Sequence, residues 1–480
     1  MQEIQYILQC LSPVLDKTAL NQLTTIVFAV LSMTGRVTML GISRWTFGPG
    51  GSYSTVQRFF NTNIYWLHIN WYLFRNHVYD PDDTYLLAGD EVVVTKSGNE
   101  TFGIDRFFSS LFNRVVKSIC FFNLALISVK NRTAHPIFSK QIVRSDEEGN
   151  EQSTHEEAKE KSKNNTEQEA AKEPKVKESK RKAKTRKSKG KKNKGKQKSP
   201  KKKTGRPKGS KNKDKVNVKL PAHLVFIKTM IMLVLNIFLL RMGIRYLLLD
   251  GAFGDNNSLQ MARMCGLYLV SKLRVDSALY FPYEGQQNKR GRRRKYGEKI
   301  DYKKIPKEHL KSSKVDLKKK TRTDIYQMTM LHKEFGQSLN VVIIVKTNIV
   351  TGESRHVILF SADLELPYEK LVDYYSLRFQ IEFTFRDAKQ YWGLEDFMNI
   401  KEQQVNNAAN LAMFMVLLSK ILLKRLSHRH PDWSVLDLKA HFRSLRYVLE
   451  ILKLFPKNLD PILIRQLLNN IPNLGAIHNS

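Results

Sequence analysis

The stretch YLLAGD, residues Tyr85–Asp90, is a short apolar run that ends on an acid, and YLLLDG, residues Tyr246–Gly251, repeats the pattern. Each run predicts a buried β-strand whose aspartate, Asp90 or Asp250, lies at the edge of a sheet. Carboxylates at strand ends can converge there, and hard oxygen ligands of this kind select Mg²⁺ or Mn²⁺. Aspartates are also common as caps and turn residues, so these two acids are a weak signal by themselves.

Further strands and a helix are predicted around the two acidic runs. The aromatic and branched runs Ser118–Val129 and Ile137–Val143 predict two strands that form an antiparallel meander with the strand ending at Asp90. After the second acidic run, Asn256–Cys265 predicts a helix and Leu267–Leu273 a strand. This mixture of strands and helices indicates the α/β class.

The region from Arg274 to about Arg355 is predicted to be an insertion with β patterning. Strands are expected at Val341–Thr347 and His356–Phe360, and a long helix at Pro367–Tyr391. The remainder, from Gln403 to about Leu454, has helical periodicity.

The predicted long helix carries four polar side chains on one face. At about 100° per residue, one narrow stripe contains Tyr375, Arg378, Glu382 and Lys389. A carboxylate flanked by basic groups suits a site that handles a phosphate backbone. The structural alternative is an internal ion pair of Arg378 with Glu382 at i, i+4, which accounts for two of the four residues.

The spacing Tyr375-x2-Arg378-x3-Glu382-x6-Lys389 resembles the Tyr-Arg-Glu-Lys signature of one large group of bacterial DDE insertion-sequence transposases. The stretches Gly89-Asp90-Glu91 with Lys96-Ser97-Gly98, and Leu249-Asp250-Gly251, are similar to the first and second acidic motifs of that group. The resemblance runs from about Tyr85 to Leu394. The group often has Asp-Asp-Thr at its first motif, where this chain has Asp90-Glu91-Val92. Successive strand residues face opposite sides, so only one of the two acids is expected to be a ligand, and we choose Asp90.

The resemblance implies a ribonuclease-H-like mixed sheet flanked by helices, with a β-rich insertion before the last carboxylate. It implies that Asp90, Asp250 and Glu382 are catalytic and hold two Mg²⁺ (or Mn²⁺) ions. Arg378 and Lys389 would then grip phosphates at the transposon end, with Tyr375 on the backbone beside them. Members of the group cleave the ends of their own element, typically through a hairpin, and join its 3′ ends to target DNA. A homodimer is therefore expected in the DNA complex.

The charge of the chain points independently to a polyanionic partner. Its 480 residues include 80 basic and 45 acidic ones, which leaves a formal charge of +35. A field of this size favours nucleic acid or an anionic membrane surface over a merely solvated basic surface. Residues 180–215 alone contain twenty Lys or Arg against one acid, and residues 145–216 have almost no branched or aromatic residues. This linker is predicted to be disordered when free.

The linker contains the stretch TGRPKGSK, residues Thr204–Lys211, whose Gly-Arg-Pro core resembles an AT-hook. Such a hook would place Arg206, followed by Lys208, in a narrow A·T minor groove. The alternative is a polycation that binds phosphates without regard to sequence. Downstream, the pair Tyr391-Trp392 could stack on an unpaired base, but an aromatic pair at a helix end is more often part of the core.

The rest of the sequence limits location and redox chemistry. Cys10, Cys120 and Cys265 lie far apart, which favours reduced intracellular thiols over a disulfide framework or a zinc site. The N-terminus lacks the basic region of a signal peptide. Lys228 and Asn236 interrupt the apolar run Leu224–Leu240, which favours a buried amphipathic helix over a membrane span. The expected location is the bacterial cytoplasm, in association with the nucleoid.

Seven regions are expected along the chain. They are a helical N-terminal DNA-binding domain (1–80), three parts of the catalytic core (84–144, 219–273 and 356–400), the Lys-rich linker (145–218), the β-rich insertion (274–355) and a helical C-terminal region (401–480). The N-terminal helices, separated by a turn at Gly48–Ser52, could form a helix-turn-helix or a plain helical subdomain.

The predicted function is cut-and-paste DNA transposition. Two alternatives stay open at this level. One is another ribonuclease-H-like DNA nuclease or recombinase, and the other is an inactive, transposase-derived DNA-binding protein.

Overall fold

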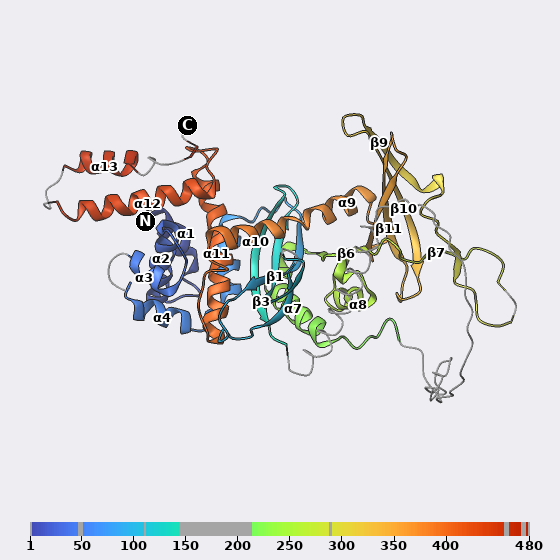
Figure 1. The fold of residues 1–480 in the computed structure, drawn as a ribbon, viewed down its shortest axis with the longest axis horizontal. Coiled ribbons are helices and arrows are strands. Elements are labelled where there is room, and N and C mark those ends of the chain that lie inside the picture. The colour runs from blue at the N-terminus through green and yellow to red at the C-terminus, as the bar shows by residue number, and fades with distance from the viewer. Residues whose placement is uncertain are drawn as a thin grey trace, which may run out of the picture. The chain divides into compact units, whose positions relative to one another are not determined.

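The computed structural model describes residues 2–46, 51–109, 112–144, 214–287, 290–455, 460–471 and 477–478. The linker predicted at 145–218, with Arg206 and Lys208, lies almost wholly outside these residues, as does most of the turn predicted at Gly48–Ser52. Among the described residues a large mixed sheet is combined with helices (Figure 1), so the α/β class is confirmed.

The first strands of the sheet form the predicted meander. They are β1 (Tyr85–Thr95), β2 (Asp105–Ser109), β3 (Arg114–Ser128) and β4 (Thr133–Ile142). β3 pairs antiparallel with β1 and with β4, and the short β2, which was not predicted, pairs with the first part of β3. Two strands then continue the sheet parallel to β1, namely β5 (Tyr246–Leu248) and β6 (Tyr268–Leu273). The resulting strand order is β4-β3-β1-β5-β6.

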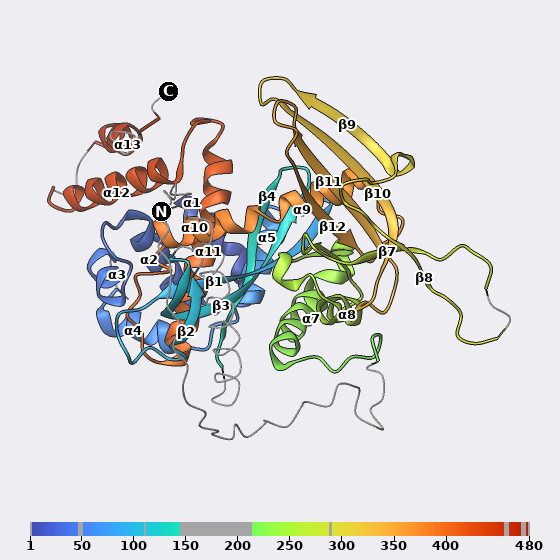
Figure 2. The same cartoon turned by 45° about the vertical axis from the view of Figure 1, so that its right-hand side comes forward.

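The region predicted as a β-rich insertion extends this sheet. Its strands are β7 (Leu279–Pro282), β8 (Tyr296–Lys299), β9 (Leu310–Asp316), β10 (Thr321–His332) and β11 (Leu339–Asn348). The next strand, β12 (Ser354–Ser361), lies almost wholly in the predicted third part of the core. β12 pairs antiparallel with β6 through Ile358–Ser361, and β11, β10 and β9 follow outward in antiparallel order. Figure 2 shows these long strands as a curved layer.

The central strands are apolar because both of their faces are covered. On β1, Leu86 and Ala88 belong to a core that includes residues of α10 and α11, whereas Tyr85 and Leu87 belong to a second core that includes residues of α7 and α8. The alternation of consecutive residues between two cores follows from the two-residue period of a strand.

Helices lie before, between and after the strands. The N-terminal ones are α1 (Gln2–Leu8), α2 (Lys17–Ser32), α3 (Met39–Trp45), α4 (Tyr53–Asn61) and α5 (Trp66–His77). The later ones are α7 (Ala222–Met242), α8 (Asn256–Met264), α9 (Tyr368–Leu377), α10 (Gln380–Tyr391), α11 (Glu402–Leu426), α12 (Val435–Leu452) and α13 (Pro461–Asn470). Short 3₁₀ helices are η1 (Gln9–Leu11), η2 (Gly251–Phe253) and η3 (Lys307–His309).

Helix α7 covers the apolar run Leu224–Leu240, which was predicted to form a buried amphipathic helix. Leu224, Ile227 and Ile231 are buried in the core, while Val225 and Leu233 are exposed, so the helix packs through one side. In the part of the chain that the structure describes, no helix is long and apolar enough to cross a membrane.

The N-terminal helices are joined to the rest of the fold by buried polar contacts. The indole nitrogen of Trp66 donates to Asn407 Oδ1 at 2.9 Å, and the amide of Asn407 donates to the carbonyl oxygen of Phe60 at 2.8 Å. Phe28 on α2 meets Phe442 on α12 edge to face. These contacts link residues more than 300 positions apart in the sequence, so α2, α4 and α5 pack directly on the C-terminal helices.

Two predicted element boundaries were wrong. β1 continues to Thr95, so Asp90 lies in the middle of a strand and not at its end, because the pairing with β3 extends over the whole length of β1. The predicted helix Pro367–Tyr391 is divided into α9 and α10 at Arg378 and Phe379. At this point Phe379 N donates to Ser376 O and Ile381 N donates to Arg378 O, which is the three-residue spacing of a tightened 3₁₀ turn.

Candidate active site

The register of two parallel strands sets Asp90 and Asp250 side by side. β1 and β5 pair through Leu87 with Leu247 and through Ala88 with Leu248, and β5 then ends. Each aspartate is two residues beyond the last of these pairs, so the two side chains are at the same level. The Asp90 side chain is only 18% exposed, and its own strand continues beyond the end of β5.

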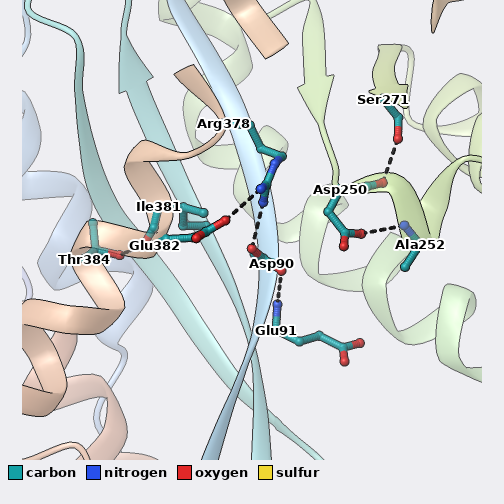
Figure 3. Close-up of polar contacts among 9 residues, drawn as sticks. All are labelled: Asp90, Glu91, Asp250, Ala252, Ser271, Arg378, Ile381, Glu382 and Thr384. Carbon is teal, nitrogen blue, oxygen red and sulfur yellow. Dashed lines mark hydrogen bonds and ion pairs between the residues drawn. The ribbon is translucent and has the colours of Figure 1, made fainter. Parts of the chain in front are cut away.

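Asp90 and Glu91 point to opposite faces of the sheet. The Glu91 carboxylate accepts from His223 Nε2, or pairs with it when that ring is charged, at 2.9 Å at the start of α7. Figure 3 shows Glu91 directed away from Arg378, while Asp90 faces it. His223 was not predicted to lie here, because no local sequence pattern connects two residues 132 positions apart.

Helix α10 brings the third carboxylate to the same face as Asp90. Glu382 lies in the first turn of α10, where the partial positive charge of a helix N-terminus favours an anion. In Figure 3 the Asp90 carboxylate lies between those of Glu382 and Asp250. Asp250 and Glu382, from distant parts of the chain, both lie near enough to act electrostatically on Asp90.

Arg378 bridges two of these acids. Its Nη1 donates to Asp90 Oδ2 at 2.9 Å, and its Nη2 donates to Glu382 Oε1 at 2.7 Å. The Arg378 side chain is only 12% exposed. The i, i+4 ion pair that the sequence offered as the structural alternative is therefore present, but the same guanidinium also binds an acid from β1.

The electrostatics of the site are those of crowded, poorly hydrated acids. Burial raises the pKa of Asp90 to about 7, Asp250 and Glu382 raise it too, and Arg378 and the backbone N–H of Glu91 lower it. Burial alone would lower the pKa of Arg378, but Asp90 and Glu382 raise it above its ordinary value. A cation is needed here, and the guanidinium supplies one.

Asp250 is held by its backbone surroundings. Its side chain caps η2 by accepting from Ala252 N at 3.0 Å, and its carbonyl oxygen accepts from Ser271 Oγ on β6 at 2.7 Å. Gly254 follows closely, and a Cβ there would meet the carbonyl oxygen of Lys272 at 2.2 Å. These contacts fix the segment after β5 against β6.

Gly89 fits the crowded side of β1. A Cβ at this position would come within 2.7 Å of Phe122 Cζ and 3.0 Å of Leu249 Cδ2. The glycine of the first acidic motif therefore has a packing role on the face opposite Asp90.

The two remaining residues of the predicted stripe have different surroundings. Tyr375 lies near Arg378, Asp250 and Asp90, and burial raises the pKa of its phenol. Lys389 lies about two turns beyond Glu382, where its amine donates to Val93 O at 2.8 Å and pairs with Glu395 Oε1 at 2.8 Å. The structure thus brings Tyr375, Arg378 and Glu382 to the acids and gives Lys389 a separate partner.

The structure also describes the aromatic pair Tyr391-Trp392 and the cysteines. Trp392 is 1% exposed and lies under the Lys439 amine, so it belongs to the core, as the alternative for Tyr391-Trp392 proposed. All three cysteines are free thiols. Within the described ranges no group of three His, Cys, Asp or Glu side chains is arranged to hold a metal ion, which agrees with Arg378 lying between Asp90 and Glu382.

Comparison with known protein families gives the class of the protein. The model of the DDE superfamily endonuclease family matches residues 9–334, which include Asp90 and Asp250, whereas Glu382 lies beyond the match. The chain therefore belongs to the DDE superfamily endonucleases, a family of transposase-like nucleases. Nucleases of this kind act on DNA and generally use divalent metal ions. No curated protein matches the chain significantly.

Proposed function

We propose that this protein is a cut-and-paste DNA transposase that cleaves the ends of its own insertion sequence and joins them to target DNA. The observation that carries the proposal is that Arg378 binds both Asp90 on β1 and Glu382 on α10. Asp250 lies level with Asp90 just beyond the end of β5. The Tyr-Arg-Glu-Lys spacing, with Tyr375 and Arg378 beside these acids, supports assignment to that group of transposases.

The strand order supports a ribonuclease-H-like core. An antiparallel β4-β3-β1 set is followed by the parallel strands β5 and β6, and the β-rich residues come before the helix that carries Glu382. The position of the β-rich residues before this helix fits the insertion that the resemblance to the transposase group implied.

The acids fit divalent metal ions by the chemistry of their donors. All three supply hard carboxylate oxygens. Burial disfavours the charged form of Asp90, so a nearby cation would stabilise its carboxylate. Asp90, Asp250 and Glu382 would hold two Mg²⁺ or Mn²⁺ ions. When bound, the ions would activate the attacking oxygen and neutralise the leaving oxygen of a phosphodiester.

Arg378 would have to change partners before the acids could act together. Phosphate offers a guanidinium the same paired oxygens that Asp90 and Glu382 now supply, so a DNA phosphate can take their place. We therefore assign Arg378 to a backbone phosphate at the transposon end, with the Tyr375 phenol beside it. Lys389 is assigned to a second phosphate, which would replace Glu395.

The reaction consists of two displacements at phosphorus. In the first, a water oxygen bonds to the phosphorus at the element end, and the bond to the 3′ oxygen breaks to leave a 3′-hydroxyl. In the second, that 3′-hydroxyl attacks a target phosphodiester and displaces the target's own 3′ oxygen. In each step the attacking oxygen gives up a proton and the departing 3′ oxygen takes one up to become a hydroxyl, and no protein side chain becomes covalently attached.

The protein would act as a homodimer, because the two ends of the element must be bound at once. In the linker, Arg206 and Lys208 are assigned to contacts with A·T-rich DNA. Location with the bacterial nucleoid in the cytoplasm follows from this function.

The test uses DNA fragments that carry the sequences flanking the reading frame on each side. Asp90→Asn, Asp250→Asn and Glu382→Gln should each reduce Mg²⁺-dependent cleavage and strand transfer to below a few percent while leaving binding to the fragments intact. Glu91→Gln, on the opposite face of β1, is the matched control and should retain most activity. Cleavage without joining of the 3′ ends to a plasmid would reduce the proposal to a nuclease, and cleavage by any of the three variants would reject that residue.

A further inference from the structure

Two hairpin turns come together at the free end of the outer strands. The β9–β10 turn is Leu317–Lys320, and the β11–β12 turn is Ile349–Glu353. Thr321 pairs with Asn348, and Ile349 N donates to Lys320 O at 3.0 Å, which ties one turn to the other. β12 joins β6 only through its last residues, so both turns lie at the opposite end of the layer. We call these two turns the β tip.

The β tip and the strand ends next to it are basic. Residues 314–324 and 346–355 contain seven Lys or Arg against three acids. One of the acids, Asp324, is buried and bound to Arg322 and Ser313. Within the described part of the chain no acidic partner is recorded for Lys318 or Lys320. The surface thus presents net positive charge to solvent.

Large apolar side chains lie among these lysines. Leu317 is 78% exposed and Val350 is 69% exposed, and Ile349 between the turns is also exposed. Single exposed apolar residues are ordinary, but here two of the most exposed large apolar residues in the described part of the chain lie on two turns that touch. An apolar pair surrounded by lysines is suited to a polyanion that also offers apolar surface.

The turns are held in one conformation before any partner binds. Lys319 N donates to Asp316 Oδ1 at 3.1 Å, and Val350 N donates to Asn348 Oδ1 at 2.9 Å. Lys320 and Gly352 occupy the left-handed region at φ 50° and 74°, as tight hairpin turns require. Because the turns are already ordered, binding costs little conformational entropy.

We propose that the β tip is a second binding site for duplex DNA, in which the lysines contact phosphates and Leu317 and Val350 enter the minor groove. Apolar side chains that press between base steps from the minor groove unstack them and bend the duplex. Duplex DNA combines closely spaced phosphates with the apolar faces of sugars and bases, and it is the substrate class of the family. The site would therefore bend DNA at a distance from the three catalytic acids. The inference rests only on the use of DNA and does not require strand transfer.

The test begins with affinity. The full-length triple variant Lys318→Glu, Lys319→Glu, Lys320→Glu is compared with Lys303→Glu, Lys304→Glu, Lys307→Glu, which makes the same charge change before β9. Binding to a 30-bp duplex without element sequence is followed by fluorescence anisotropy over a range of salt. Loss of three phosphate contacts should make the slope of log K against log salt shallower by about 2.7 in the first variant. Equal changes in both variants, or no change in the first, would overturn the proposal.

The apolar residues are tested by bending. A duplex labelled at both ends should show higher energy transfer with wild type, and the double variant Leu317→Ser, Val350→Ser should lose that increase while keeping the salt slope. If the double variant bends the duplex as wild type does, Leu317 and Val350 do not enter the minor groove. A changed oligomeric state in sedimentation, or lost binding to anionic vesicles with DNA binding intact, would assign the surface to a second copy or to a membrane and overturn the proposal.

The outcome is separable from that of the proposed function. Asp90→Asn should bend the duplex as wild type does, because the β tip does not include the acids. Thermal melting of every variant is measured first, and only variants that melt within a few degrees of wild type are interpreted.

Discussion

The guanidinium of Arg378 donates to the Asp90 carboxylate at 2.9 Å across 288 positions of sequence, and its other nitrogen binds Glu382. One arginine thus occupies the space that two of the three candidate metal ligands would share. It supplies the positive charge that the buried acids need.

Removal of this guanidinium should uncover the acids that we propose bind metal. In DNA-free protein, Arg378→Ala should bind Mn²⁺ at least several-fold more tightly than wild type, as measured by electron paramagnetic resonance. The same variant should melt lower than wild type without metal, because Asp90 and Glu382 lose their cation, and added Mn²⁺ should recover the difference. Arg378→Lys keeps the positive charge, so its Mn²⁺ affinity and its melting temperature should lie between those of wild type and Arg378→Ala. Equal Mn²⁺ affinity in all three proteins would show that Arg378 does not compete with metal.

Gly89 should be more sensitive to substitution than another glycine of the same motif. Gly89→Ala places a methyl group against Phe122 and Leu249, and overpacking of this kind costs about 1–3 kcal/mol of the free energy of unfolding. Gly98→Ala is the matched control, because no atom of the described residues lies within 4 Å of its Cβ position. Urea denaturation of both variants measures the difference. Equal midpoints would mean that β1 shifts to accept the methyl group without cost.

Acid should destabilise the fold through His135. Burial, with Lys420 and Lys424 nearby, lowers the pKa of this histidine to about 3, and its Nδ1 has no hydrogen-bond partner among the described residues. The unfolded chain takes up a proton below its pKa of 6.5 and the native chain does not, so stability falls as pH decreases from 6.5 toward 3. The contribution is about 1.4 kcal/mol per pH unit.

Substitution of this histidine tests the pH effect. Between pH 6.5 and 5, His135→Phe should lose less stability than wild type, whereas His68→Phe, at an exposed position, should follow wild type. Parallel curves of melting temperature against pH for wild type and His135→Phe would contradict the assignment.

Lys389 and Glu395 separate a DNA contact from a structural ion pair. The pair is partly exposed, so its loss should change the free energy of unfolding by at most about 1 kcal/mol. If Lys389 binds a phosphate, Lys389→Ala should weaken binding to cleaved ends about tenfold or more, since a charge-assisted contact is worth roughly 1.5–3 kcal/mol. Glu395→Gln should leave binding unchanged or improve it, because it releases the amine. A matching loss in both variants would leave the pair merely structural.

The Gly-Arg-Pro stretch of the linker should give the protein a preference for A·T-rich DNA. Arg206→Ala should abolish a preference for A·T-rich competitor DNA, because an arginine in the narrow minor groove reads its shape and potential. Lys208→Ala should lower affinity for all duplexes by a similar factor. If wild type shows no such preference, the segment acts as a polycation.

The amino-acid pattern alone predicted the α/β class, the meander of β1, β3 and β4, the strands at Tyr246 and Leu267, and the shared face of Tyr375, Arg378 and Glu382. Those features depend on local periodicity, which neighbouring residues carry by themselves. The strand that bears Asp90 was cut short, because its length depends on pairing with β3, whose residues lie some thirty positions later. The break between α9 and α10 was missed for a similar reason, since the stripe of side chains continues across it.

Tertiary structure decided which charges meet. Only the parallel register of β1 and β5 sets Asp90 level with Asp250, and only the packing of α10 on β1 lets one guanidinium bind both Asp90 and Glu382. The same holds for Glu91 with His223 and for the two turns of the β tip. Periodicity along a chain specifies which face of an element a residue occupies, but not what lies opposite that face. The partner comes from elements hundreds of residues away, and long-range packing alone brings them within the few ångströms over which charges and hydrogen bonds act.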